Sequence, residues 1–575
     1  MGIKATITNA AEITILAPID ANYKTGGGDI NVGACLVVAE KGIPFKAMQV
    51  YGGTSSLQDQ FGLPLPKKSP YMEGLRHVHD ASEECSYVNA IRVVDPLTYR
   101  FPSISCLITN DRGAWNATIR YKLNDIVTYL QKQYICVYAG DTGIISSDTP
   151  NTSSDWELYE EPVKKYTNRW NATITCGSGA FAVFYVVDGD TSVNRSFKIT
   201  SIDTNAERFT IEFYDKDELG EEYLLESYTV GISEDDKDDM GLSAYIETVL
   251  ERNSDIFRCD FDESQTWSGL LATLQGFVGT KVSFTGGTTG DTPSTQDFIT
   301  GANILRNDKL AANLIFAAGI YDITVIAELA SIADERHVAF FYDVPPGLKS
   351  AEAIAWNRTI SMRNRHARAY YSPISATDQW RGGTCVWGVS GAMAAAKARC
   401  NKIVTVGSVP GVHYSPAGEQ RGYLTRTGIS QLYEDDVVNR DNLYDARINP
   451  IWPSVTSGMV ADDDLTQWPL TNYLRFGWIN DVLDYIDHRF LEGAQQIKFE
   501  PDGLTREGLM DVTRRILDDL VTSGALVAPR EPDRDGLNPY IITIEQLEID
   551  LWKVTWEVCI TGAARRIVGQ PKLIR

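Results

Sequence analysis

Residues 338–343, Val338-Ala339-Phe340-Phe341-Tyr342-Asp343, form a continuous apolar run that ends in an acid. Such a run predicts a strand that is buried on both faces, as in a parallel sheet. A helical pattern follows, which we expect to open with Ser350 as its N-cap and to run through Arg368. Because helix and strand patterns alternate in this way from Gly301 to about Pro453, the segment predicts an α/β domain.

The residues before this domain predict a smaller α/β region and a β-sandwich. Strand-like runs at 33–38, 45–50 and 88–94 surround a short helix near 72–84, which lies between strands as a crossover does. Further on, four evenly spaced runs bounded by Gly, Asp and Asn have the pattern of a sandwich that ends near Phe284: 181–187, 196–202, 208–214 and 224–230. Between the two regions the composition shifts to Tyr, Trp, Asp, Thr and Ser, which predicts a small inserted β module.

The end of the chain predicts two amphipathic helices followed by strands. The first helix carries Ile479, Val482 and Ile486 and ends at Gly493, and the second carries Leu509 and Leu517 and ends at Gly524. The strand-rich segment after them places four apolar residues on one face: Val554, Trp556, Val558 and Ile560.

The first residues of the chain also alternate, with Ile7, Ile13 and Ile15 in apolar positions, before Pro18 and the glycines at 26–28 break the pattern. Exposed alternating strands pair within their own sheet or recruit a strand from another chain. We therefore predict that both termini are arms that exchange strands between subunits. The alternative is that the two termini pair with each other in one closed domain.

Together these patterns predict an α+β multidomain protein with a β-sandwich, an α/β domain, a C-terminal α/β domain and extended terminal arms. The predicted segments are an N-terminal arm 1–25, an N-terminal α/β region 26–105, an inserted β module 106–165, a sandwich 166–285, an α/β domain 286–455, a C-terminal helical domain 456–538, and C-terminal strands and arm 539–575.

Composition narrows the function classes. The chain has 575 residues, 43% of them hydrophobic, which suits several folded domains. Its formal net charge of −23 opposes direct binding to nucleic acid, which needs clustered basic residues. No apolar run is long enough for membrane insertion, since the longest, 310–333, contains Asp322 and Glu328. Nine cysteines without a C-x-x-C pair favour reduced thiols and no zinc site.

Several short motifs occur along the chain. The first are GTSSLQDQFG at 53–62, NAIRVV at 89–94, SAYIE at 243–247 within 228–255, and VSFTGGTTGD at 282–291. They are followed by YYSP at 370–373, VWGVSGAMA at 386–394 and SPAGE at 415–419. In this order the motifs resemble those of the contractile bacteriophage tail sheath family: the first two resemble its N-terminal region, and 282–291 is similar to a glycine-rich turn of the family. Residues 476–480 depart from the family pattern.

This resemblance implies a structural protein, not an enzyme, that needs no cofactor and whose α/β domain is subtilisin-like but non-catalytic. It implies a homo-oligomer of hexameric rings stacked helically around a tail tube protein, with baseplate and tail terminator proteins as further partners. Contraction would drive the tube through the host envelope for viral genome ejection and host cell entry. The location would be the virion tail, after folding and assembly in the host cytoplasm. The alternatives are the sheath of a related contractile injection system and a carbohydrate-binding tail decoration protein.

A subtilisin-like domain raises the hypothesis of a hydrolase. The sequence shows no Asp, His and Ser in the contexts that such proteases use, which argues against proteolysis. His77 and His79 lie beside Asp80, but residues two apart on a helix do not face each other, so we expect ordinary surface or packing histidines there. The glycines at 286–290 lack a following Gly-Lys-Ser/Thr and predict a tight turn, not a phosphate site.

Two surfaces remain as candidate binding sites. The inserted module resembles a small chitin-binding type of carbohydrate-binding domain, and its aromatic residues either contact glycan or form the core of a tiny domain: Trp115, Tyr121, Tyr134 and Trp156. The helix at 505–523 carries Arg506, Arg514 and Arg515 beside several aspartates, a mixture that suits contact with the tail tube or a solvated face.

Overall fold

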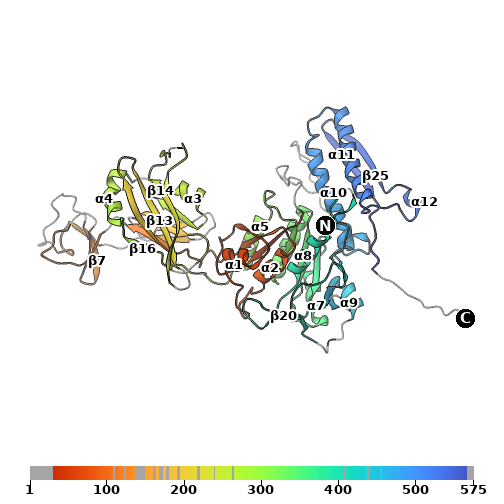
Figure 1. The fold of residues 1–575 in the computed structure, drawn as a ribbon, viewed down its shortest axis with the longest axis horizontal. Coiled ribbons are helices and arrows are strands. Elements are labelled where there is room, and N and C mark those ends of the chain that lie inside the picture. The colour runs from red at the N-terminus through yellow and green to blue at the C-terminus, as the bar shows by residue number, and fades with distance from the viewer. Residues whose placement is uncertain are drawn as a thin grey trace. The chain divides into compact units, whose positions relative to one another are not determined.

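The computed structural model describes residues 30–107, 110–121, 125–136, 149–158, 164–167, 173–176, 180–190, 194–216, 220–238, 240–254, 256–261, 265–406, 409–433, 436, 439–454, 456 and 458–565. The predicted N-terminal arm, with Ile7, Ile13 and Ile15, lies outside these residues. The chain divides into two compact units (Figure 1). We call the described residues within 1–39, 45–93 and 293–575 the α/β unit, and those within 40–44 and 94–292 the β unit.

The α/β unit is built on an eight-stranded sheet in the order β2-β3-β1-β17-β18-β19-β23-β24. The six central strands are parallel, and an antiparallel strand, β2 or β24, closes each edge. The strands are β1 (Val32–Val37), β2 (Ala47–Val50), β3 (Tyr87–Arg92), β17 (Leu314–Phe316), β18 (Ala339–Asp343), β19 (Ala367–Tyr371), β23 (Ile448–Pro453) and β24 (Met459–Ala461).

Helices cover both faces of this sheet, so successive strand residues enter different cores. Cys35 packs with α1 (Thr54–Phe61), α2 (Gly74–Ser82) and α8 (Ser390–Asn401). Its neighbour Leu36 packs with α5 (Thr295–Ile304), α6 (Ile323–Arg336) and α7 (Ser350–Ile360). Burial on both faces explains why the sequences of the central strands are largely apolar runs.

Local capping fixes the ends of the helices. Asp322 caps α6 by accepting hydrogen bonds from the backbone N–H groups of Thr324 at 2.8 Å and Val325 at 3.3 Å. His337 ends the same helix in the left-handed conformation, with φ of 51°. Smaller elements complete the unit: β20 (Ile374–Thr377), β21 (Thr384–Val386), β22 (Ser430–Gln431), α9 (Arg440–Asp445), the 3₁₀ helix η2 (Tyr473–Arg475) and α12 (Pro532–Asp535).

Two sequence predictions about this unit are wrong. The predicted regions 26–105 and 286–455 are not separate, because β1 and β17 lie side by side in one sheet, with Gly33 opposite Leu314. The helix predicted to run from Ser350 through Arg368 ends at Ile360, since Ser361 adopts the left-handed conformation, and Arg368 lies in β19. The N-cap of that helix is Lys349.

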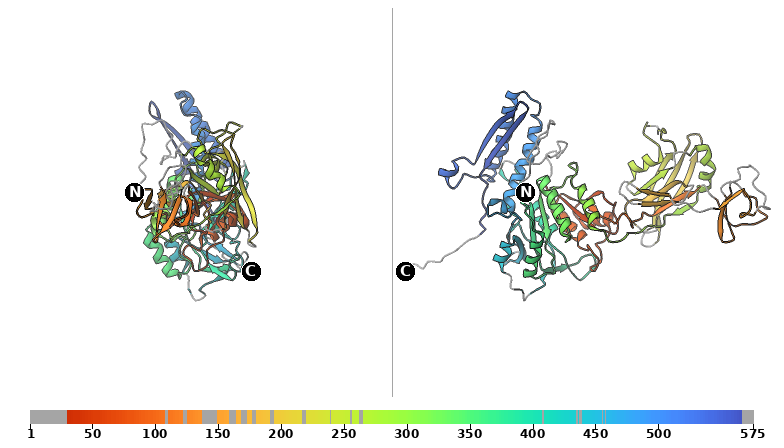
Figure 2. Two further views of the ribbon diagram at one scale, coloured as in Figure 1. Left: turned by 90° about the vertical axis from the view of Figure 1, so that its left-hand side faces the viewer. Right: turned by 180° about the vertical axis from the view of Figure 1, so that it is seen from behind.

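The C-terminal part of the α/β unit consists of two helices and a β-hairpin. Helices α10 (Gly477–Gln495) and α11 (Asp502–Thr522) match the two predicted amphipathic helices. Strands β25 (Tyr540–Glu548) and β26 (Leu551–Val558) pair antiparallel and lie along the helices (Figure 2). Their inward side chains pack against α10 and α11: Tyr540, Ile542, Ile544, Trp552, Val554, Trp556 and Val558. We call this part the C-terminal subdomain.

The hairpin corrects the prediction that Val554, Trp556, Val558 and Ile560 belong to an arm that leaves its own chain. These residues pack in the core clusters of their own subdomain, and Trp556 lies 5.0 Å from Phe490 of α10 between ring centroids. The predicted boundary at 539 therefore cuts through one packed unit. The alternating pattern was correct, but it does not encode which surface the apolar face covers.

The β unit contains two sheets that share one aromatic core. One sheet has the order β15-β11-β4 and the other β14-β13-β12-β16, both antiparallel. Phe213 and Phe257, from different sheets, stack at 4.1 Å between centroids in this core. The elements are β4 (Ser103–Leu107), β11 (Ala180–Val186), β12 (Ser196–Asp203), β13 (Arg208–Lys216), β14 (Glu222–Gly231), α3 (Ile246–Asn253), β15 (Phe257–Phe261), α4 (Trp267–Phe277) and β16 (Lys281–Ser283).

A small sheet lies between β4 and β11 in the sequence, as predicted for an inserted module. Its order is β5-β6-β7-β8, from β5 (Asn110–Ala114), β6 (Asp125–Tyr129), β7 (Lys132–Cys136) and β8 (Trp156–Leu158). A two-stranded ribbon, β9 (Lys164–Thr167) with β10 (Thr173–Cys176), follows it. Within the described residues, no helix has the length and apolar character needed to cross a membrane.

Candidate functional site at the docking of helix α10

Helix α10 is anchored on the sheet by three aspartates spaced three residues apart, Asp481, Asp484 and Asp487, all of them buried. Such spacing places them on one side of the helix. Apolar residues of the same helix, among them Val482 and Ile486, are buried as well. The side of α10 that faces the rest of the unit is therefore both apolar and charged, and each aspartate needs a partner there.

The first aspartate, Asp481, belongs to a buried charge cluster around Arg368 of β19. The Arg368 guanidinium contacts Asp464 at 3.2 Å and Asp481 more closely, and it donates to the carbonyl of Gly477 at 3.2 Å. Lys397 of α8 reaches Asp481 at 2.7 Å. Although burial alone would lower the pKa of Arg368, the carboxylates of Asp464 and Asp481 outweigh it and raise that pKa. The cluster joins a strand, a loop and two helices.

Close packing at this cluster requires glycine at the first position of α10. A Cβ on Gly477 would lie 2.3 Å from a carboxylate oxygen of Asp464 and 2.6 Å from the Arg368 guanidinium carbon. Asp464 also accepts a hydrogen bond from the backbone N–H of Trp478 at 3.1 Å. The start of α10 is thus held by side chains from outside the helix, as the exposed N–H groups of a first turn require.

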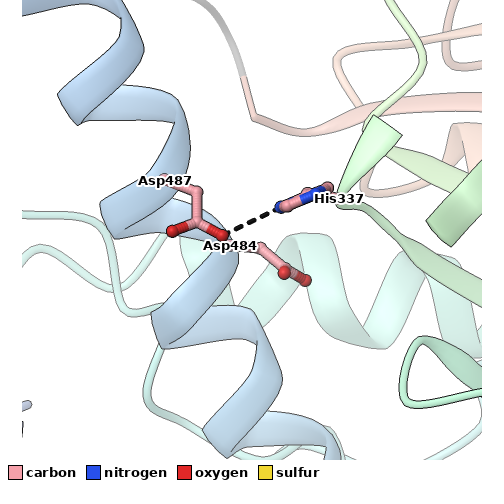
Figure 3. Close-up of side chains that lie close together, drawn as sticks. All are labelled: His337, Asp484 and Asp487. Atoms are coloured by element: carbon pink, nitrogen blue, oxygen red, sulfur yellow. Dashed lines mark hydrogen bonds and ion pairs between the residues drawn. The ribbon is translucent and has the colours of Figure 1, made fainter. Parts of the chain in front are cut away.

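The other two aspartates meet a group of histidines. His366 places its Nδ1 2.9 Å from Asp334 of α6 and its Nε2 3.0 Å from Asp484 of α10. His337, which follows α6, places its Nδ1 2.8 Å from Asp487 (Figure 3). Arg365 pairs with Asp484 at 3.3 Å. We call Asp334, His337, Arg365, His366, Asp484, Asp487 and His488 the histidine–aspartate cluster.

The geometry of His366 indicates that it carries two ring protons. A neutral imidazole can donate from only one nitrogen, yet both nitrogens of His366 lie within hydrogen-bond distance of a carboxylate. Burial lowers the pKa of His366, but the charge of Asp484 and the hydrogen bonds to Asp334 and Asp484 outweigh this and raise the pKa. The same contacts lower the pKa of Asp484 and of Asp334 against the effect of burial.

The ligand atoms of His337, Asp484 and Asp487 lie within 4.8 Å of one another (Figure 3), which is close enough for one metal ion. The charges around them do not suit a divalent cation. Asp484 already pairs with Arg365 and His366, and Asp487 already accepts from His337. An added cation would be repelled by the guanidinium of Arg365 and by the imidazole of His366, which is hydrogen-bonded to two carboxylates. We therefore assign this trio to an ion-pair network and not to a metal site.

The structure brings together an acid, a histidine and a serine that the search for protease sequence contexts did not connect. His77 of α2 has its Nδ1 3.3 Å from Ser390 Oγ of α8 and its Nε2 3.4 Å from Glu73, so a nucleophile, a base and an acid are adjacent. The sequence did not reveal this because Ser390 lies on a helix far from α2 in the chain. His77 and Ser390 are fully buried.

The contacts of Glu73, His77 and Ser390 suit the packing of α2 against α8 and do not suit a catalytic triad in this conformation. The backbone N–H of Gly391 donates to His77 Nδ1 at 3.1 Å, so the lone pair that would take the serine proton is already used. Asp343 holds the start of α8 by accepting from the backbone N–H groups of Val389 at 2.7 Å and Ser390 at 2.9 Å. A Cβ on Gly391 would lie 2.2 Å from the carbonyl oxygen of His77, which shows how closely α2 and α8 approach. Of the two alternatives predicted for His77, a surface or a packing histidine, its complete burial supports the second.

The remaining predicted site residues are not brought together. Arg506, Arg514 and Arg515 are all exposed on α11, which leaves the predicted tube contact untested. In the inserted module, Tyr121 is 1% and Trp156 5% exposed, and both belong to its small core, so their ring faces cannot stack on a sugar in this conformation. Trp115 and Tyr134 are half-buried against the same core.

No protein-family model matches this sequence, and no curated protein matches it. Solved structures give distant similarities. One is a chain in the 6-fold symmetrised baseplate of the anti-feeding prophage (AFP), with 15% identity, TM-score 0.38, and coverage of 51% of this chain and 76% of that chain. A second is the sheath complex of the extracellular contractile injection system PVC in its contracted state, with 16% identity, TM-score 0.37, and coverage of 53% and 84%.

A third is the helical sheath of AFP in its contracted state, with 14% identity, TM-score 0.37, and coverage of 49% of this chain and 75% of that chain. Similarity at this identity and TM-score does not establish a function, so the function of this chain is inferred from its own residues.

Proposed function

We propose that this chain is a structural subunit of a contractile tail sheath. The observation that carries the proposal is the β25–β26 hairpin. Among the described residues, it forms a sheet of two strands only, so each strand keeps one outer edge without a partner strand. Along these edges, the part of the chain that the structure describes covers only the segment just beyond β26, where Leu526 bridges Ile560. Long open edges with alternating side chains are sites where a strand from another copy can be added.

The N-terminal segment supplies the matching strand in this proposal. Ile7, Ile13 and Ile15 alternate with polar residues, as a strand with one buried face does. Added to a neighbour's hairpin, that strand would link subunits into hexameric rings that stack helically around a tube protein. The ordered motifs from residue 53 to residue 419 that resemble the sheath family support the same proposal. Baseplate and tail terminator proteins would bind the two ends of the stack.

Electron microscopy of the purified chain tests the proposal. We expect long hollow tubes in negative stain, and we expect that deleting residues 1–18 abolishes them while the circular dichroism spectrum and thermal unfolding of the chain stay unchanged. The reason is that only a strand between subunits is lost. A chain that stays monomeric at high concentration, or tubes that persist after the deletion, would contradict the proposal.

The exposed arginines of α11 give a second expected result, on tube binding. Arg514 and Arg515 are exposed on the helix, so reversing their charge should not disturb folding. We expect Arg514→Glu with Arg515→Glu to yield empty sheaths when the chain is assembled with its tube protein, because complementary charges at the contact become repulsive. Arg358→Glu, an exposed arginine on α7, is the matched control. Tube-filled sheaths from the double variant would remove these residues from the contact.

The same features fit the sheath of a related contractile injection system, and the presence or absence of a genome-filled head on the native particle distinguishes it from a phage tail. A carbohydrate-binding decoration is the other candidate. Trp115 and Tyr134 remain the residues of the inserted module that could contact glycan, since their side chains are not fully buried.

A further inference from the structure

The histidine–aspartate cluster joins helix α10 to two other parts of the α/β unit. Asp334 belongs to α6, which covers one face of the sheet, and His366 directly precedes β19. Asp484 and Asp487 belong to α10, the first helix of the C-terminal subdomain. His366 is the link between them, because its ring lies between Asp334 and Asp484 with 1% of its surface exposed.

This link exists only in one protonation state. With two ring protons, His366 donates to both carboxylates at once. After loss of one proton, one ring nitrogen presents a lone pair to a carboxylate oxygen about 3 Å away, which replaces a charge-assisted hydrogen bond with repulsion. Because His366 and Asp484 are both buried, water does not readily take over a lost contact between them.

We propose that His366 is a proton-dependent latch: with both ring protons it ties α6 to α10, and loss of one proton loosens helix α10, and with it the C-terminal subdomain, from the α/β sheet. The inference concerns the subdomain of this chain alone and does not depend on the proposed sheath function.

The neighbouring charges set the direction of the pH dependence. The acidic neighbours are Asp334 and Asp484, which face His366, and Asp487, which faces His337. The basic neighbours are Arg365, which pairs with Asp484, and His337, whose ring lies 6.0 Å from the His366 ring. His488 of α10 contacts the carbonyl of Arg336 at 3.0 Å, and burial lowers its pKa.

The pKa of His366 is raised, so its contribution to stability is complete below the pKa of an unfolded histidine, about 6.5, and is lost as the pH rises through the raised value. The lowered pKa values of Asp334 and Asp484 give stability that is present above about 3.9 and lost on strong acidification. Because the pKa of His488 is lowered, protonating this histidine at acidic pH also reduces the stability. Among Asp334, His366, Asp484 and His488, only His366 makes docking weaker as the pH rises from about 6 to about 9.

Hydrogen–deuterium exchange of the full chain, kept dilute to limit assembly, tests the latch. Between about pH 6 and about pH 9, a range that brackets a raised histidine pKa, we expect protection factors of peptides from α10 to fall about tenfold, the ratio that corresponds to one unit of pKa coupling. Peptides from β1, which lies outside the cluster, should keep theirs. In His366→Gln we expect the protection of α10 to be low throughout and independent of pH in this range.

Two further variants make the test specific. His79→Gln, on α2 and outside the cluster, should keep the wild-type profile. Asp334→Asn removes the negative charge of one of the two acceptors, at a partly exposed position, so it should fold even where His366→Gln does not. It should move the midpoint of the α10 transition to lower pH by about one unit. Constant protection of α10 in the wild-type chain, an unchanged profile in His366→Gln, or an unmoved midpoint in Asp334→Asn would overturn the latch.

Discussion

Replacing Arg368 by methionine is expected to destabilise the α/β unit by about 3–5 kcal/mol, the range measured when one partner of a buried ion pair is removed. Arg368 is fully buried and is the cation between Asp464 and Asp481. Methionine fills similar space but leaves both carboxylates without their main counter-charge, and Lys397 contacts only Asp481 among them. Hydrogen–deuterium exchange of β19 and α10 peptides across a urea series measures the stability of the α/β unit separately from that of the β unit.

Two comparisons separate charge from packing in that result. Adding Asp464→Asn and Asp481→Asn to the Arg368→Met chain should recover part of the lost stability, because no unpaired charge then stays buried. Arg358→Met, on the exposed side of α7, should change stability by no more than about 0.5 kcal/mol. Equal effects of Arg368→Met and Arg358→Met would show that the buried cluster does not stabilise the docking of α10.

Sequence patterns predicted which segments form helices and strands better than they predicted which strands pair with one another. The run at 338–343 was recognised as a buried strand because every residue of β18 is covered, on alternating faces, by helices. The pairing of distant strands in the sheet could not be predicted, since Gly33 of β1 pairs with Leu314 of β17 although the whole β unit lies between them in the chain. Pairing between distant strands is set by the closure of the whole core, which no local period records.

The docking site of α10 was missed for a related reason. Charges on an amphipathic helix normally indicate its solvated side. In α10, however, Asp481, Asp484 and Asp487 lie on the buried side, and their partners come from β19, the residues just before it and the end of α6. The one available signal was that these acids recur every third residue among the apolar positions. That spacing predicts a buried charged stripe only if distant basic residues are known to meet it.

The sequence also left open whether the C-terminal strands serve their own chain or another, and the fold decides this for one face of the hairpin. Trp556 points toward Phe490 of α10 and packs with residues of both helices, while Thr555 lies on the exposed face. The inward face therefore belongs to the subunit itself. The backbone edge of each strand and the outward face are the parts of the hairpin that its own subdomain leaves uncovered for the proposed contacts with other copies.

A matched pair of substitutions distinguishes these two roles. We expect Trp556→Ala to destabilise the C-terminal subdomain by about 2–4 kcal/mol, slightly below the 3–5 kcal/mol typical of a fully buried tryptophan because the ring is only partly covered. Thr555→Ala should cost less than about 0.5 kcal/mol. Exchange of α10 and α11 peptides in the unassembled chain measures both. If Trp556→Ala left the isolated chain unchanged and weakened only the assembled tubes, the inward face of the hairpin would belong to contacts between subunits after all.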